Sequence, residues 1–303
     1  MPELPEVEVV RAGLQPAVTG AIVAGVEIFD ERSLRRHQPA AGSFTDQLSG
    51  RRILAAVRRG KFLWLPLDSG RAVVIHLGMS GQVLLRTPGA TTDHLLRIRL
   101  SLEHPTHGEL WVNFVDQRVF GSMAVDAMAP TADGLPGGYS GTVEEDAPWR
   151  DHIPTQVAHI ARDPIDPSFS ASAFFALLAR KNTGIKRALL DQNLISGIGN
   201  IYADETLFAA RIHYEQPASS LSHAQATTLL AAVRTILQRA LAEGGTSFDA
   251  QYVNVNGQSG YFAHSLEAYG RHGTPCSRCG TLIVRERFMN RGSHFCPQCQ
   301  RLR

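Results

Sequence analysis

The sequence lacks a long apolar run, has no cysteine before position 276, and contains only three lysines among its 30 basic residues. Because no apolar run approaches the roughly 18–20 residues needed to span a bilayer, we expect no membrane-spanning segment. The acidic, helix-like N-terminus is unlike a secretory signal peptide, so we expect a cytosolic protein. Hydrophobic residues make up 44% of the 303-residue chain, which is ample for packed cores and excludes a disordered or fibrous protein.

The three lysines are Lys61, Lys181 and Lys186. Arginine is effectively always protonated, whereas lysine can lose its proton and react as an amine. A lysine retained in an arginine-rich chain therefore points to chemistry, although coding bias explains the same pattern.

The four cysteines form two pairs, Cys276-x2-Cys279 and Cys296-x2-Cys299, separated by sixteen residues. In a reducing compartment this spacing indicates four thiolate ligands for one Zn²⁺ rather than a disulfide framework. No fifth ligand or acidic base lies within the cluster, so we expect a structural zinc whose binding free energy, on the order of 10 kcal/mol, replaces the core that so short a module cannot build. Residues 282–288 are strand-like and 289–292 turn-like, which places Arg291 at the tip of a hairpin.

The net charge of +2 conceals a separation of charge along the chain. Residues 271–303 hold seven arginines and one acid, a net +6, so the other 270 residues carry −4. Residues 51–61 hold five positive charges and no acid. Such clusters are typical of polyanion binders, and a basic ribbon favours nucleic acid over the alternative of a protein-interaction module. On charge alone, a solvated charged face explains the clusters equally well.

Hydrophobic periodicity divides the chain into a β-rich N-terminal part and a helical C-terminal part. Apolar residues at helical spacing predict a helix over 4–14, ended by Gly13 and Pro16. An antiparallel sandwich follows, with predicted strands at 22–29, 62–67, 72–77, 95–102 and 110–115. Further helices are predicted at 169–180, 185–195, 200–211 and 222–244.

These patterns predict an α+β fold: an N-terminal helix with an antiparallel β-sandwich, then a helical domain that ends in a zinc ribbon hairpin. The expected segments are the sandwich domain at 1–127, a linker or excursion at 128–168, the helical domain at 169–270 and the ribbon at 271–303. Pro- and Gly-rich composition sets the second segment apart.

The N-terminus has two interpretations. Prolines in a first helical turn and carboxylates near its positive end are ordinary features of a helix start. Removal of Met1, however, would expose the secondary amine of Pro2, and an α-amino group with a pKa of about 8 offers roughly a hundredfold more free amine at neutral pH than lysine does. Amines attack electrophilic carbons to form Schiff bases, and Glu3 and Glu6 are close enough in sequence to donate or accept the protons.

The chain contains seven motifs: PELPEVE at 2–8, RGKF at 59–62, HLGMSG at 76–81, DQRVFG at 116–121, GIGNIYADE at 197–205, GYF at 260–262 and the cysteine ribbon. Together they resemble those of one family, the formamidopyrimidine-DNA glycosylases. The motifs lie in order along nearly the whole chain. Each is modest alone, but the set is highly specific.

The resemblance implies catalytic roles for five residues. Pro2 matches the nucleophile that attacks the anomeric carbon of a damaged nucleoside, and Glu3 matches the carboxyl group that shuttles protons at the sugar. Glu6 resembles a supporting carboxylate, and Lys61, placed on a strand, matches the lysine credited with base release and β-elimination. Arg291 matches the arginine assigned to phosphate contact and δ-elimination, which we interpret chiefly as a phosphate clamp.

The resemblance also implies residues that bind DNA around an extruded nucleotide. Phe120 matches the wedge and Met79 the plug that fill the vacated space, and Arg118 matches the partner of the orphaned cytosine. The family usually has a second arginine after Arg118, where this chain has Val119, and that puts one auxiliary contact in doubt. Residues 197–200, between two predicted helices, resemble the turn of the family's helix-two-turn-helix module, so the helical domain at 169–270 is expected to be that DNA-binding module. Asn200, Lys181 and Lys186 are its candidate phosphate contacts, although a solvated helix surface explains the two lysines equally well, and His76 and His94 are further candidates for binding DNA. Residues 246–262 resemble the loop that covers the everted base.

The resemblance thus implies a bifunctional DNA glycosylase and abasic-site lyase of base excision repair, acting on 8-oxoguanine and formamidopyrimidines. The expected partner is double-stranded DNA with an oxidised base or abasic site, bound by a monomer in the bacterial cytosol or nucleoid, and the expected cofactor is one structural Zn²⁺. Two alternatives stay open: an endonuclease VIII-like enzyme for oxidised pyrimidines, and a non-catalytic binder of damaged DNA.

Overall fold

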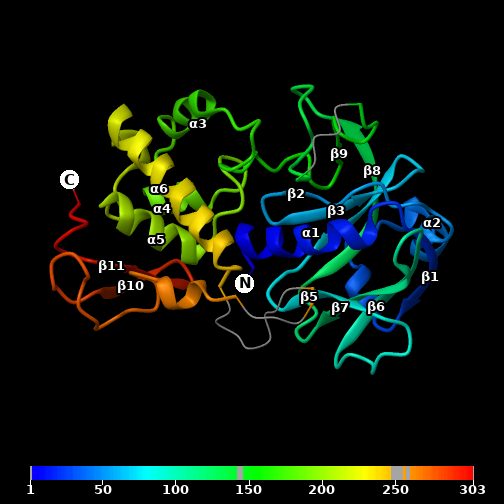
Figure 1. Ribbon diagram of the computed structural model, residues 1–303. Helices are drawn as coiled ribbons and strands as arrows, with labels where there is room; N and C mark the ends of the chain where they lie inside the picture. The colour runs from blue at the N-terminus through cyan, green and yellow to red at the C-terminus, as the bar shows by residue number, and fades with distance from the viewer. Residues whose placement is uncertain (1, 142–145, 247–254, 257–259, 303) are drawn as a thin grey trace. The chain divides into compact units, whose positions relative to one another are not determined.

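The computed structural model describes residues 2–141, 146–246, 255–256 and 260–302, and its backbone divides into two compact units (Figure 1). The first unit comprises Met1–His159 and Thr246–Gly260, and the second comprises Ile160–Gly245 and Tyr261–Arg303. Most of the predicted base-covering loop, residues 247–254 and 257–259, lies outside the described residues. No helix of the described chain is both long and apolar enough to cross a membrane.

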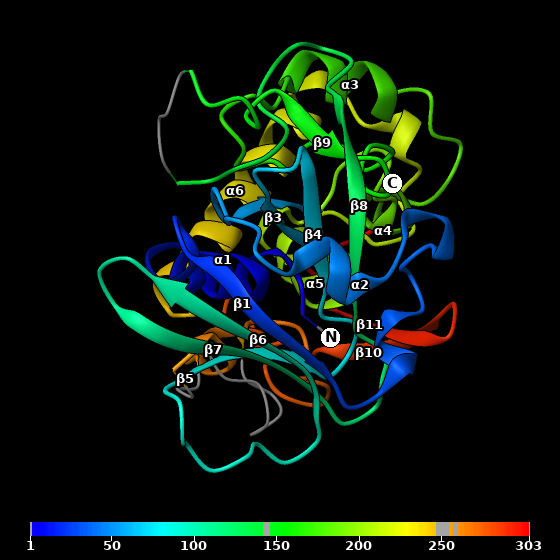
Figure 2. The same cartoon turned by 90° about the vertical axis from the view of Figure 1, so that its right-hand side faces the viewer.

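The first unit is an antiparallel β-sandwich with α1 (Leu4–Val18) beside both sheets (Figure 2). One sheet has the order β1-β6-β7-β5, with bounds Ile22–Ile28, Leu96–His104, Gly108–Asp116 and Gly81–Arg86. The other has the order β2-β3-β4-β8-β9, with bounds Val57–Arg59, Phe62–Pro66, Arg71–His76, Ser122–Pro130 and His152–Pro154. The predicted α+β sandwich is confirmed.

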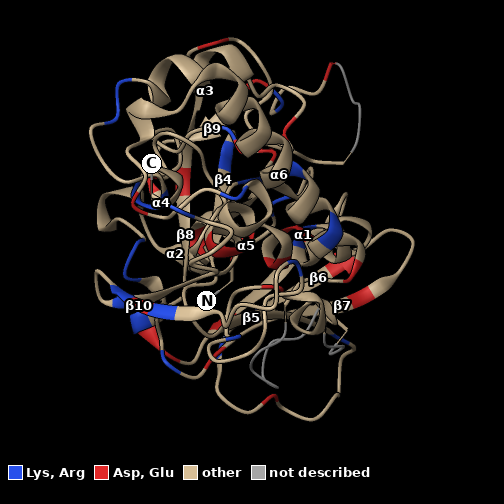
Figure 3. Cartoon of the chain, turned by 90° about the vertical axis from the view of Figure 1, so that its left-hand side faces the viewer, with Lys and Arg blue, Asp and Glu red and all other residues tan. Residues whose placement is uncertain are grey.

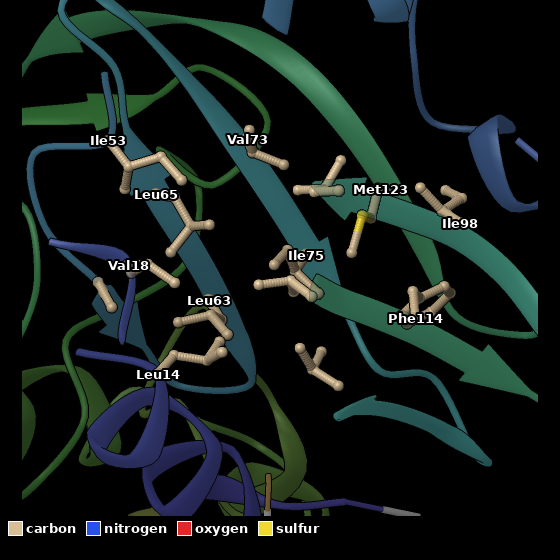
Figure 4. Close-up of a cluster of buried hydrophobic side chains, with 14 of the residues drawn as sticks. Leu14, Val18, Ile53, Leu63, Leu65, Val73, Ile75, Ile98, Phe114 and Met123 are labelled. Carbon is tan, nitrogen blue, oxygen red and sulfur yellow. The ribbon is translucent and has the colours of Figure 1, made fainter. Parts of the chain in front are cut away.

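Alternating side chains of the two sheets meet in one core (Figure 4). Leu63 and Leu65 of β3 and Ile75 of β4 face Ile98 of β6 and Phe114 of β7, and all five are buried. Every residue of β3 is buried, because its opposite face is covered as well.

Helix α1 is longer than the sequence predicted. It continues through Pro16 to Val18, although proline lacks the N–H that an interior helix position donates. Burial of Leu14 and Val18 in the sandwich core offsets that lost hydrogen bond, and local pattern alone does not reveal such packing.

The segment at 128–168 is more than a connection, because it adds β9 to the sheet edge at β8 and pairs Tyr139 with Arg58 of β2, the strand at the other edge of the same sheet. Tyr139 exchanges backbone hydrogen bonds with Arg58, 2.9 and 2.8 Å long. The ring of Tyr139 lies 5.3 Å from the Arg11 guanidinium and 6.0 Å from that of Arg58. An alanine Cβ at Gly138 would come within 2.5 Å of the Arg58 carbonyl oxygen, so only glycine allows this close approach.

The second unit contains four α-helices and a β-hairpin among its described residues: α3 (Ala171–Leu178), α4 (Ile185–Leu190), α5 (Asn200–Ala210), α6 (His223–Ala242), β10 (Val284–Phe288) and β11 (Arg291–Phe295). Ser222 caps α6 in a reciprocal capping box with Gln225. Helix α4 ends at Leu190, earlier than predicted. Beyond it the Gln192 side chain donates to the carbonyls of Leu190 and Ile198 and accepts from Gly197, so it organises the glycine turn before α5.

Candidate functional site

The start of α1 is held by the carboxylate of Glu6. Its Oε2 accepts a hydrogen bond from the Glu3 backbone N–H at 2.8 Å, and its Oε1 accepts from the Thr246 N–H at 2.8 Å and hydroxyl at 2.9 Å. Pro2 and Glu3 are buried. Glu6 therefore fixes the backbone immediately after Pro2.

Lys61 lies in the two-residue turn between β2 and β3 and not, as the sequence predicted, on a strand. The preceding Gly60 has a φ of +57°, which glycine adopts without strain. A tight hairpin turn fixes the backbone at Lys61, and β2, the strand that leads into the turn, is linked to α1 by an ion pair. In that link the Glu8 carboxylate lies 2.9 Å from Arg58 Nε of β2 and 2.8 Å from Arg11 of its own helix.

A cationic patch surrounds the ring of Phe62, the residue after Lys61. His76 pairs with Phe62 across β3 and β4, with ring centroids 4.8 Å apart, and the Arg36 guanidinium lies 5.5 Å from the Phe62 ring. Burial, followed by the nearby charges of which Arg36 acts most strongly, lowers the pKa of His76 to about 4. His76 is therefore neutral at pH 7. Its Nδ1 accepts from the Gly78 N–H at 3.2 Å, which leaves Nε2–H as a donor.

The plug and wedge candidates lie on two adjoining loops of the sandwich: the plug loop, residues 77–80 between β4 and β5, and the wedge loop, residues 117–121 between β7 and β8. Met79 and Phe120 are 44% and 46% exposed, far above the core residues of the same unit, and the Arg118 guanidinium lies 5.2 Å from the Phe120 ring. The buried carboxylate of Asp116 holds the base of the wedge loop by accepting from the N–H groups of Arg118 at 3.1 Å and Gly121 at 2.6 Å. Solvent-exposed apolar tips on a braced base suit insertion into a base stack.

His94 stands apart from these groups in the described structure. It lies exposed in the turn before β6. No described contact ties its side chain to the cationic patch.

In the second unit, Lys186 has a different place from the one the sequence suggested. It is fully buried, and its Nζ lies 2.6 Å from Asp204 Oδ1 and 3.2 Å from the Gly292 carbonyl oxygen. Asn200 Nδ2 donates to the same carbonyl at 3.1 Å. An ammonium buried in this ion pair is not open to a phosphate, so Lys186 supports the chain at Gly292, next to Arg291.

Arg291 begins β11, directly opposite Phe288 at the hairpin end, in agreement with its predicted place at the tip. Asp204 also accepts from the backbone and ring of His294, at 2.9 and 3.1 Å, so β11 is anchored on both sides of Ser293. Lys181, by contrast, is partly exposed and pairs with Asp191 at 2.7 Å. Figure 3 shows the basic residues that accompany the hairpin, with Arg285 and Arg287 on β10.

The four cysteine sulfurs meet as a zinc site requires. The Sγ atoms of Cys276, Cys279, Cys296 and Cys299 all lie within 4.8 Å of one another, close to the separation of about 3.8 Å expected for tetrahedral Zn–S bonds of about 2.3 Å. Burial and the neighbouring sulfurs raise the pKa of Cys299 to about 12, so a divalent cation is what would allow all four thiols to ionise. Cys276 and Cys296 are buried in a small core with Phe208 and Ile283, where the metal would act structurally.

Three family models match the chain: the formamidopyrimidine-DNA glycosylase N-terminal domain over residues 1–123, the H2TH domain of the same enzymes over 160–251, and the zinc finger found in FPG and IleRS over 273–302. A formamidopyrimidine-DNA glycosylase of Leifsonia xyli is 68% identical over the full length of both chains. The chain belongs to the formamidopyrimidine-DNA glycosylase family. The resemblance drawn from the seven motifs is therefore confirmed, as is the expectation of one structural zinc.

Other family members agree over the whole chain. A formamidopyrimidine-DNA glycosylase of Thermobifida fusca is 53% identical over 99% of this chain and 97% of its own. The MutM (Fpg) protein from Thermus thermophilus, whose crystal structure is solved, is 34% identical in sequence. Its structure matches this one with a TM-score of 0.77 over 100% of each chain. A Lactococcus lactis Fpg variant in complex with Fapy-dG-containing DNA is 28% identical with a TM-score of 0.79, over 99% of this chain and 100% of that one.

Sequence reasoning did not single out Arg35, Arg36 or Asp204. Arg35 and Arg36 follow a short helical turn (Glu31–Leu34), and no acid follows them until Asp46, which is a weak signal of a basic site. Asp204 gave no signal, since a carboxylate within a helix is ordinarily solvated.

We predict that the purified protein contains one zinc per chain and that Cys296→Ser loses nearly all of it. Removing one thiolate from a structural site forfeits most of a binding free energy on the order of 10 kcal/mol. The β10–β11 amides should then lose protection from hydrogen exchange. As a matched control, His272→Ala removes an exposed potential ligand from the same segment and should keep its zinc. Full zinc in Cys296→Ser, or loss in His272→Ala, would contradict the four-cysteine site.

Proposed function

We propose that the protein is a bifunctional DNA glycosylase and abasic-site lyase of base excision repair that excises oxidised purines, 8-oxoguanine and formamidopyrimidines. The observation that carries the proposal is the placement of Pro2 immediately before a helix start that Glu6 holds, in a chain that belongs to this family. We further propose that it acts as a monomer on double-stranded DNA in the bacterial cytosol.

Removal of Met1 would make Pro2 a secondary amine at the positive end of α1. A helix N-terminus disfavours a nearby cation, so the free amine gains at the expense of the ammonium form. The amine attacks the anomeric carbon of the damaged nucleotide, and the bond from that carbon to the base breaks as the base leaves with a proton. The attached amine loses its proton, the bond from the anomeric carbon to the ring oxygen then breaks as that oxygen takes up a proton, and the ring-opened sugar stays attached to Pro2 as an iminium. Glu3, buried and adjacent, would move protons at the sugar and offset the iminium charge.

Elimination follows from the iminium, which acidifies the neighbouring sugar hydrogen. Loss of that proton expels the 3′ phosphate, and a second elimination expels the 5′ phosphate. We assign to Lys61 proton transfer in base release and the first elimination. Arg291, at the tip of an anchored hairpin, would hold a flanking phosphate in the second unit.

The remaining contacts would open the duplex and grip its backbone. Phe120 and Met79 would fill the space left by the extruded nucleotide, and Arg118 would pair with the orphaned base. The backbone N–H groups at the start of α5 would bind phosphate beside Asn200, whose side chain holds the Gly292 carbonyl, with Lys181 and His94 as further candidates. Lys186 would act indirectly through Gly292.

The side chains around Phe62 would form a further site in the first unit that binds a phosphate of the DNA backbone. Arg36 is half-buried, and desolvation followed by the charge of Arg35 lowers its pKa. Among the described residues no carboxylate is paired with it. A half-buried cation beside Lys61 and the neutral donor His76 is stabilised by a phosphate, so we assign Arg36 to this site with them.

We predict that the protein cuts a duplex containing 8-oxoguanine opposite cytosine much faster than one containing thymine glycol, and that Pro2→Gly lowers the rate at least about a hundredfold, since the secondary amine is lost. Single-turnover kinetics on both duplexes measures this. Faster cutting of thymine glycol would identify the endonuclease VIII-like alternative. Tight lesion binding without cleavage by a protein whose Met1 is removed would identify a non-catalytic binder.

We predict that Arg36→Gln lowers the slope of the logarithm of DNA affinity against the logarithm of salt concentration by about one, as expected for one lost phosphate contact. Binding titrations at several salt concentrations measure the slope. The control is Arg32→Gln, because Arg32 is exposed and already paired with Asp30 at 2.7 Å. Its slope should match the parent protein. Equal slopes for the parent and Arg36→Gln would remove Arg36 from the phosphate site.

A further inference from the structure

One guanidinium holds three successive carbonyl groups of the wedge loop. Arg35 Nη1 donates to the carbonyl oxygens of Val119 at 2.7 Å and Gly121 at 2.9 Å, and its Nη2 donates to that of Phe120. Arg35 follows the helical turn Glu31–Leu34, more than eighty residues earlier in the chain. Three consecutive carbonyls pointing at one side chain is a conformation that neither helix nor strand provides.

The loop needs such support because its backbone is strained. Val119 has a φ of +53°, and a β-branched residue rarely occupies this left-handed region. The position is also where this chain departs from the family motif by having valine instead of arginine. A loop that costs free energy to form keeps its shape only where the surroundings hold it.

The two sides of the loop are held by opposite charges. Asp116 accepts the N–H groups of Arg118 and Gly121, while Arg35 takes the carbonyl groups between and beside them. The plug loop closes a third side. A Cβ at Gly78 would come within 2.3 Å of the Phe120 carbonyl, so the two loops are in direct backbone contact.

We infer that Arg35 is a positioning residue for strand opening: it holds the wedge loop in the strained conformation that presents Phe120 and Arg118 to the duplex. The inference rests on the proposed function and deepens it. Arg35 touches neither the reacting sugar nor the base in this role. It acts through the loop, and its importance is confined to substrates whose lesion must be extruded from a duplex.

The test compares two substrates of the same enzyme. Arg35→Gln should lower single-turnover excision of 8-oxoguanine from a duplex at least about tenfold, as for the loss of one charge-assisted hydrogen bond, because glutamine keeps an N–H donor but not the charge. Cleavage of a single-stranded oligonucleotide with a preformed abasic site should stay within about twofold of the parent, because no base is extruded. Arg32→Gln, from the same helical turn, should leave both rates unchanged. The ratio of the excision rates with cytosine and with adenine opposite the lesion should become smaller in Arg35→Gln, because Arg118 lies in the same loop.

A second substitution separates positioning from a direct phosphate contact. Glycine adopts the left-handed conformation without strain, so the loop of Val119→Gly needs less support. The double variant Arg35→Gln with Val119→Gly should therefore recover duplex excision to within about threefold of the parent. A lost phosphate contact would not be restored by glycine at position 119.

Three results would overturn the inference: parent-like duplex excision in Arg35→Gln, an equal loss on the single-stranded abasic substrate, or no recovery in the double variant. Thermal unfolding of each variant checks that it is folded. Failure of the parent itself to cleave the abasic strand would reject the proposed function instead, so the two failures are distinguishable.

Discussion

The arrangement of the first unit depends on the ion pairs that the buried carboxylate of Glu8 makes. That carboxylate joins Arg11 of its own helix to Arg58 of β2, and both guanidinium groups flank the Tyr139 ring. Removal of Glu8 would take the carboxylate from two buried guanidinium groups at once, and loss of a buried charge partner is strongly destabilising. Once Met1 is removed, the proposed nucleophile Pro2 has no residue before it, and its position is set by the helix that follows. Glu8 ties that helix to the strand that leads into Lys61.

Wherever the protein is proposed to bind DNA, a polar or charged side chain likewise holds the backbone beneath the exposed residues. Asp116 and Arg35 hold the wedge loop, Lys186 and Asp204 hold the start of β11, and Gln192 holds the glycine turn. Buried charged groups inside each unit thus position exposed side chains. Several of the charges counted in the small net charge of the chain are therefore buried and do not contact a ligand. In the proposed function, phosphate binding would depend on the fewer cations that stay accessible, among them Arg36 and Arg291.

Local pattern predicted the elements well and the supporting contacts poorly. The strands at Ile22–Ile28 and Phe62–Pro66 were found within a residue, because alternation and turn residues report local burial. Cysteine spacing defined the zinc ligands for a similar reason. The burial of Lys186, the strand at His152–Pro154 and the carbonyls held by Arg35 all depend on partners distant in sequence. No window along the chain contains that information. The turn position of Lys61 was missed because Gly60 was interpreted as part of a basic run.

The most direct test of the account is the identity of the atom that becomes bonded to DNA. Borohydride reduction during reaction with an 8-oxoguanine duplex, followed by proteolysis and mass spectrometry, locates the cross-link. The account predicts one adduct, on a peptide that begins at Pro2 with Met1 removed, attached through the N-terminal nitrogen. An adduct on Lys61 or any other lysine, or a trapped complex whose peptide retains Met1, would contradict it.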